Sequence, residues 1–184
     1  LRPFSQNYKV SVGRKIPMVF LNHAQHRKEE FGKKYNATIF KQAAERLEEI
    51  CDVKITDENL KKACEVYNEN RALKREFVKL CGDYSQTIKA SDRSNVLKAS
   101  HHMLKDEHNK MLKELIEALK AMPKEECKGP RVVTSGVITD NPALLQVLDD
   151  FNICVVADDV ASESRGFKVC LLYTSLSGLA RQTA

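Results

Sequence analysis

The stretch Arg131-Val132-Val133-Thr134-Ser135-Gly136-Val137 decides the fold class, together with two segments that follow it. It is a β-branched run that ends in small residues, which is typical of a strand. Asn141-Pro142 then marks a helix start, because asparagine caps helices and proline suits the first helical position. Ile153-Cys154-Val155-Val156-Ala157 is a second, continuous apolar run, as in a strand covered on both faces. This order predicts a right-handed, parallel βαβ unit.

Residues 23–128 show helical periodicity instead, with apolar and charged residues on opposite faces. Thr56 is a candidate N-cap for a helix whose end we expect at Gly82. Ser91-Asp92 is expected to begin another helix. The most regular apolar pattern spans 111–122, and Pro123 is expected to end it. The sequence therefore predicts a helical segment before the βαβ unit.

The expected fold class is α/β: a helical segment at 23–128 is followed by the start of an open parallel, flavodoxin-like sheet at 129–169. The apolar run Pro17–Leu21 is consistent with a buried strand, so residues 1–22 are expected to end a preceding α/β domain. Leu1 is not an initiator methionine, and the chain reads as a piece of a longer protein. Residues 170–184 carry one charge, at Arg181, and we expect a non-native tail there.

The composition excludes several classes of protein. The chain is 42% apolar and 30% charged with a net charge of +5, which is typical of a soluble globular protein. No run of apolar residues is long enough for a membrane span, and the first residues do not resemble a signal peptide, so we expect a cytoplasmic protein. No basic stripe with interleaved aromatics is present, and a nucleic-acid partner is not expected.

The six cysteines are dispersed, and no two form a CxxC pair. They are expected to be reduced, buried thiols, and three of them lie within helical patterns. His23 and His26, three residues apart on a possible helix, could hold a metal, but a third ligand of clear spacing is missing. His101, His102 and His108 lie on a polar helical surface and are expected to be solvated. The sequence therefore predicts no metal ligand in this chain.

The candidate binding site is the carboxyl edge of the two predicted strands, where open α/β sheets bind ligands. Ser135 and Gly136 end the first strand, and Asp158 and Asp159 follow the second, with Arg165 just beyond. A serine hydroxyl, a glycine that allows close approach and a guanidinium suit phosphate or carboxylate binding. The alternative is that Asp158 caps the next turn and pairs with Arg165. Neither a GxGxxG nor a P-loop pattern is present, so these residues do not indicate a dinucleotide or P-loop nucleotide site.

Five blocks together resemble the 2-hydroxyacyl-CoA dehydratase family, which includes the 2-hydroxyglutaryl-CoA dehydratase D-component and the benzoyl-CoA reductase subunits. The blocks are 67–73, 96–100, 140–145, 155–160 and 163–165, and the resemblance runs from about Ile16 to Val169. It implies an anaerobic enzyme of two related subunits, each with a 4Fe-4S cluster, and an ATP-hydrolysing iron–sulfur activator. Such dehydratases remove water from a 2-hydroxyacyl-CoA through a ketyl radical.

The chain departs from a full member of that family, because the cluster cysteines would lie before Leu1 and beyond Val169. We therefore expect no cluster in this chain and no activity from it alone. From the family, Ser135, Gly136, Asp158, Asp159 and Arg165 match blocks near the substrate cleft. Two alternatives stay open: a benzoyl-CoA reductase subunit, and a helical interaction module without chemistry.

Overall fold

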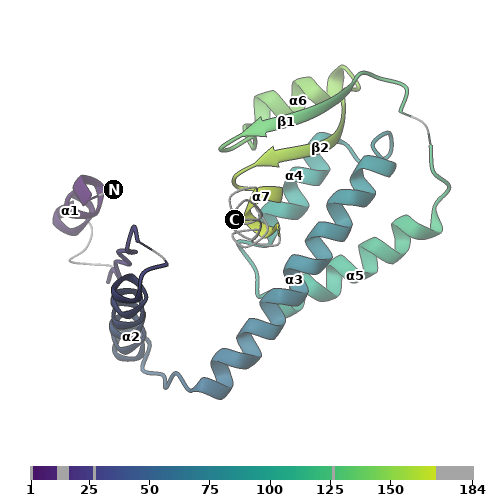
Figure 1. Cartoon of the computed structure of the whole chain (residues 1–184). Coiled ribbons are helices and arrows are strands. Elements are labelled where there is room, and N and C mark those ends of the chain that lie inside the picture. The colour runs from purple at the N-terminus through teal and green to yellow at the C-terminus, as the bar shows by residue number, and fades with distance from the viewer. Residues whose placement is uncertain (1, 12–16, 27, 126, 169–184) are drawn as a thin grey trace, which may run out of the picture. The chain divides into compact units, whose positions relative to one another are not determined.

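The computed structural model describes residues 2–11, 17–26, 28–125 and 127–168, and the chain divides into two compact units, 1–61 and 62–184 (Figure 1). The first unit contains α1 (Arg2–Ser11) and α2 (Glu30–Cys51). The second contains most of α3 (Asp57–Asp83) and then α4 (Ala90–Ala99), α5 (Lys105–Ala121), β1 (Arg131–Gly136), α6 (Pro142–Asp150), β2 (Cys154–Val160) and α7 (Ser164–Phe167). Within the described ranges, no helix is long and apolar enough to cross a membrane.

The strand expected at 17–21 is absent, and this prediction was wrong. These residues have no regular secondary structure, and Phe20 and Leu21 are 44% and 42% exposed. The loop that follows is held on α2 instead, where the backbone N–H of Ala24 donates to Oδ1 of Asn36 at 2.8 Å. The reason is that an apolar run becomes a strand only where a partner strand satisfies its backbone, and the described part of this unit has none.

The histidines of this loop also differ from expectation, because His23 and His26 do not lie on a helix. Their rings pack against Phe40 and Phe31 of α2 with centroid separations of 5.5 and 5.6 Å. Both imidazoles therefore contribute to aromatic packing. In the described part of the chain, no three side chains of His, Cys, Asp or Glu gather as metal ligands would.

The helices of the second unit form where the sequence indicates them. Thr56 Oγ1 accepts a hydrogen bond from the N–H of Asn59 at 3.2 Å, which confirms it as the cap of α3. Helix α5 ends at Ala121, two residues before Pro123. The buried side chains of α3, α4, α5 and α7 form the main core: Phe77, Cys81, Leu97, Leu112, Ile116, Leu119 and Phe167.

Gly82 does not end α3, which continues to Asp83, so its expected role was wrong. A Cβ at Gly82 would lie 2.6 Å from the carbonyl oxygen of Val156 in β2. The glycine is therefore required by the close approach of helix and strand. It sets the distance between the helical layer and the sheet.

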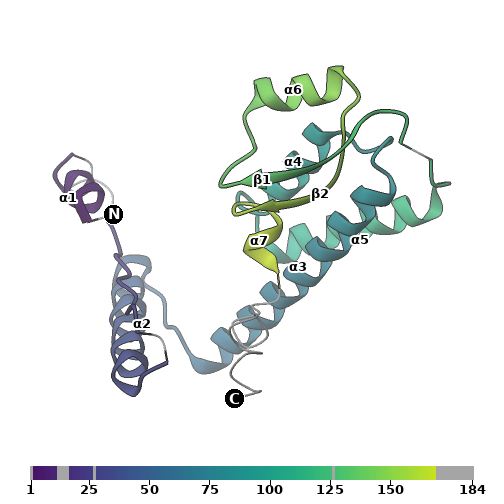
Figure 2. The same ribbon diagram turned by 45° about the horizontal axis from the view of Figure 1, so that its top comes forward.

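The predicted parallel βαβ unit is confirmed, because β1 and β2 are paired in parallel with Arg131 opposite Cys154 and Gly136 opposite Val160. Asn141 caps α6, its Oδ1 accepting from the N–H of Ala143 at 2.9 Å, and Pro142 is the first helical residue. Figure 2 shows the two strands side by side with α6 connecting them. The described part of the sheet has two strands, and its flavodoxin-like continuation stays a prediction.

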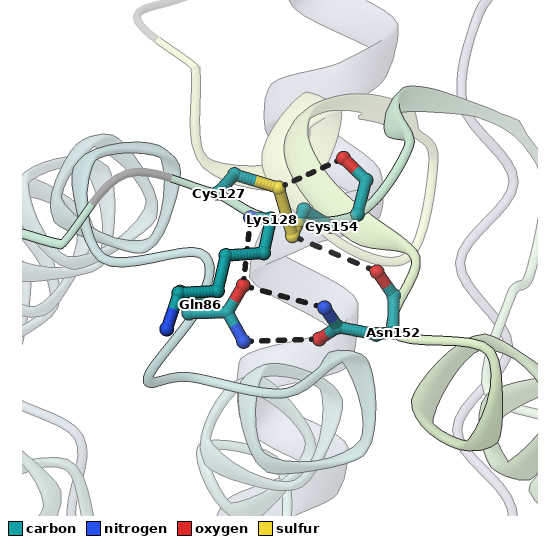
Figure 3. Close-up of a disulfide and its surroundings, with 6 residues drawn as sticks. Gln86, Cys127, Lys128, Asn152 and Cys154 are labelled. Atoms are coloured by element: carbon teal, nitrogen blue, oxygen red, sulfur yellow. Dashed lines mark hydrogen bonds between the residues drawn. A yellow bond between two sulfur atoms is a disulfide. The ribbon is translucent and has the colours of Figure 1, made fainter.

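The sequence suggested that the cysteines are reduced and buried, and the structure shows that this is not true of all of them. Cys127 and Cys154 form a disulfide, Cys51 and Cys64 are exposed, and Cys81 is buried. The disulfide joins the segment before β1 to the start of β2 (Figure 3). Sequence spacing could not indicate it, because the two cysteines come together only when β1 and β2 pair.

A polar bridge lies beside the disulfide, as Figure 3 shows. Gln86, in the turn after α3, accepts from the backbone N–H of Lys128 at 2.9 Å. Its amide also donates to Oδ1 of Asn152 at 3.1 Å. The turn after α3, the segment before β1 and the loop before β2 are thus held together at the amino end of the sheet.

Candidate functional site

The carboxyl edge of the sheet is built from the ends of β1 and β2 and the loop that follows each strand. Strand β2 extends through Asp158 and Asp159 to Val160, further than the sequence indicated. Its last residues alternate, with Asp158 and Val160 buried and Asp159 exposed. Successive side chains of a strand point to opposite faces. The two aspartates, adjacent in sequence, therefore have opposite roles.

Asp158 is a structural anchor with a fully buried side chain. Its Oδ1 accepts from the backbone N–H of Val160 at 3.1 Å and of Ser164 at 3.0 Å. The hydroxyl of Ser164 donates to the Asp158 carbonyl oxygen at 2.8 Å. Asp158 thus holds the loop between β2 and α7 and offers no exposed surface to a ligand.

Arg93 of α4 provides the counter-charge, and it links Asp158 to Glu163. The guanidinium donates to Oδ2 of Asp158 through one nitrogen and to Oε2 of Glu163 through another, and its side chain is 5% exposed. Thr139, beyond β1, donates its hydroxyl to the other Glu163 oxygen at 3.0 Å. The ends of both strands are therefore connected to one helix through buried charged groups.

Sequence reasoning missed Arg93, because an arginine within a helix ordinarily indicates a solvated charge. The available signal was the pair of carboxylates after a buried apolar run. A buried carboxylate requires a counter-charge or several hydrogen-bond donors. The sequence does not say which of the chain's basic residues supplies it.

Asp159 and Arg165 form the exposed part of the edge. Arg165 donates to Oδ2 of Asp159 at 2.7 Å and to its carbonyl oxygen at 2.6 Å, and Lys168 donates to Oδ1 at 2.9 Å. These hydrogen bonds, first from Arg165 and then from Lys168, hold the pKa of the Asp159 carboxyl well below its usual range. Both side chains of the Arg165–Asp159 pair are about half exposed, at 48% and 51%, so a ligand could reach them.

Ser135 and Gly136 complete the edge on β1. Ser135 is exposed and lies opposite Asp159 in the register. Gly136 has φ +155°, a conformation that favours glycine, and nothing lies within 4 Å of the place a Cβ would take. Four of the five predicted site residues therefore lie at one accessible edge, and the fifth, Asp158, is buried beneath it.

A small hollow of about 70 Å³ opens beside this edge, lined by residues of α4, of the turn after it and of the loops after both strands: Ser94, Leu97, Lys98, His101, Asp140, Ser162 and Glu163. Lys98 pairs with Asp140 at 2.9 Å across it. That hydrogen bond is the main reason the pKa of Asp140 lies below its ordinary value. The hollow has room for a water molecule or a small polar group, and a whole acyl-CoA needs far more space.

The described cysteines do not fit an iron–sulfur cluster. Cys51 and Cys64 are exposed on helices, Cys81 is in the core, and the sulfurs of Cys127 and Cys154 are bonded to each other. A cluster needs several thiolates that converge. Burial also raises the pKa of Cys81 to about 12, so that its thiolate is disfavoured.

Comparison with known proteins shows the family. A model of "2-hydroxyglutaryl-CoA dehydratase, D-component" matches residues 2–183, a range that includes most of the expected tail. The chain belongs to this dehydratase family. The tail itself lies outside the described residues, and its origin stays a prediction.

The relatives of this chain are named as enzyme subunits. It is 43% identical, over 92% of its length, to the (R)-2-hydroxyglutaryl-CoA dehydratase subunit beta of Acidaminococcus fermentans. It is 36% identical, over its whole length, to the (R)-phenyllactyl-CoA dehydratase beta subunit of Clostridium sporogenes. Identity to a benzoyl-CoA reductase subunit of Thauera aromatica is 26% over 73% of the chain. The chain spans 45% and 50% of the two dehydratase relatives, about half of their length.

Proposed function

We propose that this chain is part of a β-type subunit of a 2-hydroxyacyl-CoA dehydratase, a lyase that removes water from a 2-hydroxyacyl-CoA. The observation that carries the proposal is the 36–43% identity to dehydratase β subunits over 92–100% of the chain. Identity to a reductase subunit is lower and covers less of the chain. The names of the three dehydratases specify different acyl groups, so the acyl group of this chain's substrate is left open.

The complete enzyme is proposed to contain a related second subunit and to receive electrons from an ATP-dependent iron–sulfur activator. Support comes from the relatives, each named as a subunit, and from the sequence resemblance. A 4Fe-4S cluster and a ketyl-radical route are proposed for that complete enzyme. Because the described cysteines do not fit a cluster, no step of the route is assigned to a residue of this chain.

The role proposed for this chain is to build one wall of the substrate cleft. Ser135, Gly136, Asp159 and Arg165 are placed at the accessible carboxyl edge, where open α/β sheets bind ligands. Asp158 acts beneath them, since its buried carboxylate fixes the loop between β2 and α7 and the first residue of α7, the helix that carries Arg165. The Arg165 guanidinium donates to both carboxylate oxygens of Asp159 and to its carbonyl oxygen, and an anionic ligand would compete with that carboxylate.

The experiment that tests the function uses the complete enzyme. The full coding sequence, with those of the second subunit and activator, is expressed anaerobically and given a panel of 2-hydroxyacyl-CoA thioesters and benzoyl-CoA. Enoyl-CoA formed from at least one 2-hydroxyacyl-CoA supports the proposal. A dearomatised product from benzoyl-CoA alone would identify a reductase subunit. Lack of both reactions in a correctly assembled, activated enzyme would favour an interaction module.

Arg165 is tested in that enzyme by Arg165→Lys, which keeps the charge and loses the planar fork. We expect the melting temperature to stay nearly unchanged and kcat/KM to fall by about tenfold or more. Lys168→Met is the matched control, because Lys168 bonds the same carboxylate of Asp159 from a single amine, at 2.9 Å. Normal kinetics with a lowered melting temperature for Arg165→Lys would show that the Arg165–Asp159 pair is only structural.

A further inference from the structure

A cluster of cations without carboxylate partners lies where α3 meets the start of α5 and the α4–α5 connection. Lys74 and Arg71 are three residues apart on α3, close enough to share a face of the helix. Lys105, the first residue of α5, reaches the same face of α3. Its Nζ lies 5.5 Å from the ring centroid of Tyr67, and Tyr67 precedes Lys74 by two helical turns. Three basic side chains therefore lie near one another, with Lys74 buried beneath the other two.

In the described part of the chain, no ion pair joins Arg71, Lys74 or Lys105 to any carboxylate. Lys98, Lys113, Lys120, Lys124 and Arg165 of the same unit all pair with a carboxylate within 4 Å. The lack of an ion pair does not by itself set this cluster apart, because Arg75, Lys79, Lys89, Lys110, Lys128 and Arg131 also lack one among the described residues. The burial of Lys74 does set it apart.

Of the acids near this cluster in sequence, Glu69 and Glu76 pair with other lysines, and among the described residues no ion pair involves Asp106 or Glu107. Glu69 pairs with Lys113 at 2.5 Å. Asp106 lines a separate groove, between α3 and α5, together with Glu69 and Lys113. The cluster of three cations thus keeps a net positive charge.

Lys74 is the most informative member, because its residue is only 9% exposed. Its Nζ lies 4.8 Å from the ring centroid of Phe167 in α7, which is beside α3 in both views (Figures 1 and 2). A ring face attracts a cation but accepts few of the three hydrogen bonds that an ammonium can donate. A buried ammonium with no acceptor costs free energy, and an anion would remove that cost.

The electrostatics of the surroundings agree with this geometry. Burial, and then Lys105 and Arg71, lower the pKa of Lys74 to about 8. The pKa of His101 is also lowered, by burial first and then by Lys74 and Lys105. His108, expected to be solvated, is buried in fact, and its Nδ1 lies 2.8 Å from Nδ2 of Asn70. It fixes α5 against α3 and thereby fixes Lys105 in position.

We propose that Arg71, Lys74 and Lys105 form a binding site for the phosphate groups of a CoA thioester. Several converging cations suit a diphosphate or a phosphomonoester, which present several anionic oxygens at once. The choice of CoA as the source of the phosphate rests on the proposed function, whereas the anion site itself rests on the cation cluster alone. The site adjoins the carboxyl edge of the sheet, because Phe167, against which Lys74 lies, follows Arg165 by two residues in α7.

The test measures binding without turnover, by isothermal titration calorimetry of this chain with CoA and, separately, with pyrophosphate. We expect both to bind, and Lys74→Met to weaken the affinity for each by about tenfold or more. Lys110→Met, at an exposed position of α5, is the matched control and is expected to change affinity less than twofold. Binding at pH 8 should also take up protons, because an anion returns the pKa of Lys74 towards its ordinary value.

The melting temperature distinguishes a binding role from a structural one. Methionine in place of an uncompensated buried ammonium should leave stability unchanged or raise it, while affinity falls. Lys105→Met provides a second variant if Lys74→Met fails to fold, and it too should weaken binding by about tenfold.

Two results would overturn the proposal: no binding of either ligand, or wild-type affinity in both variants. Binding of pyrophosphate without CoA would keep an anion site and overturn the assignment to CoA. The proposed function fails separately, when the complete enzyme forms no enoyl-CoA although this chain binds CoA.

Discussion

Replacing Arg93 with methionine is expected to destabilise this chain strongly. The guanidinium joins Asp158 and Glu163, and the side chains of all three residues are at most 6% exposed. Without it, two buried carboxylates lose their only ion-pair partner among the described residues. Removing one partner of a buried ion pair costs about 3–5 kcal/mol, because the remaining charge is left uncompensated.

The structure places the expected loss towards the lower end of that range. Asp158 keeps two backbone N–H donors, from Val160 and Ser164, and Glu163 keeps the hydroxyl of Thr139. These hydrogen bonds solvate part of each negative charge after the arginine is gone. We therefore expect Arg93→Met to lower the free energy of unfolding by about 3 kcal/mol.

The assay is urea denaturation at pH 7, followed by circular dichroism. Lys98→Met is the matched control, because Lys98 lies on the same helix and its pair with Asp140 is exposed, so only a small loss is expected. Adding Asp158→Asn and Glu163→Gln to Arg93→Met should recover part of the loss, since it removes both buried charges. A loss below about 1 kcal/mol for Arg93→Met, or no recovery in the triple variant, would refute the reasoning.

Three further predictions concern the disulfide, the glycine between α3 and β2, and the free cysteines. Reducing the bond between Cys127 and Cys154, which are 27 residues apart, should lower the free energy of unfolding by about 3.5 kcal/mol, measured by denaturation with and without reductant. Gly82→Ala should lower it by about 1–2 kcal/mol despite alanine's better helix propensity, because the new Cβ meets the Val156 carbonyl oxygen at 2.6 Å. Iodoacetamide at pH 8 should label Cys51 and Cys64, the exposed free cysteines among the described residues, and spare Cys81, whose pKa burial raises to about 12; mass mapping of these three positions checks this.

Local sequence signals were sufficient for the βαβ unit. The β-branched run at 131–137 and the apolar run at 153–157 became paired parallel strands, and Asn141 and Pro142 began the helix between them. These signals suffice because alternation, capping and proline geometry depend on neighbours within a few residues. Local signals gave a wrong prediction at Pro17–Leu21, where the apolar run indicated a strand but has no partner strand in the described part of its unit.

The candidate edge was located from the sequence, but the role of each residue on it was not. Parallel strands bring their carboxyl ends to one edge, so Ser135 and Asp159 could be placed together. The strand's continuation past Ala157 decided which aspartate is buried, and a one-residue shift would have exchanged them.

The sequence by itself determined the family, the order of helices and strands from α2 to β2, and the edge where polar side chains gather. Only the tertiary structure decided that Arg93 neutralises Asp158 and Glu163, that Cys127 bonds Cys154, and that Lys74 is buried without a carboxylate. Arg93 lies 65 positions from Asp158 and 70 from Glu163, and the two cysteines are 27 positions apart. The isolation of Lys74 depends on which acids do not approach it. Charge and thiol patterns name the groups available for pairing, whereas the packing of α3, α4 and the sheet selects the partners.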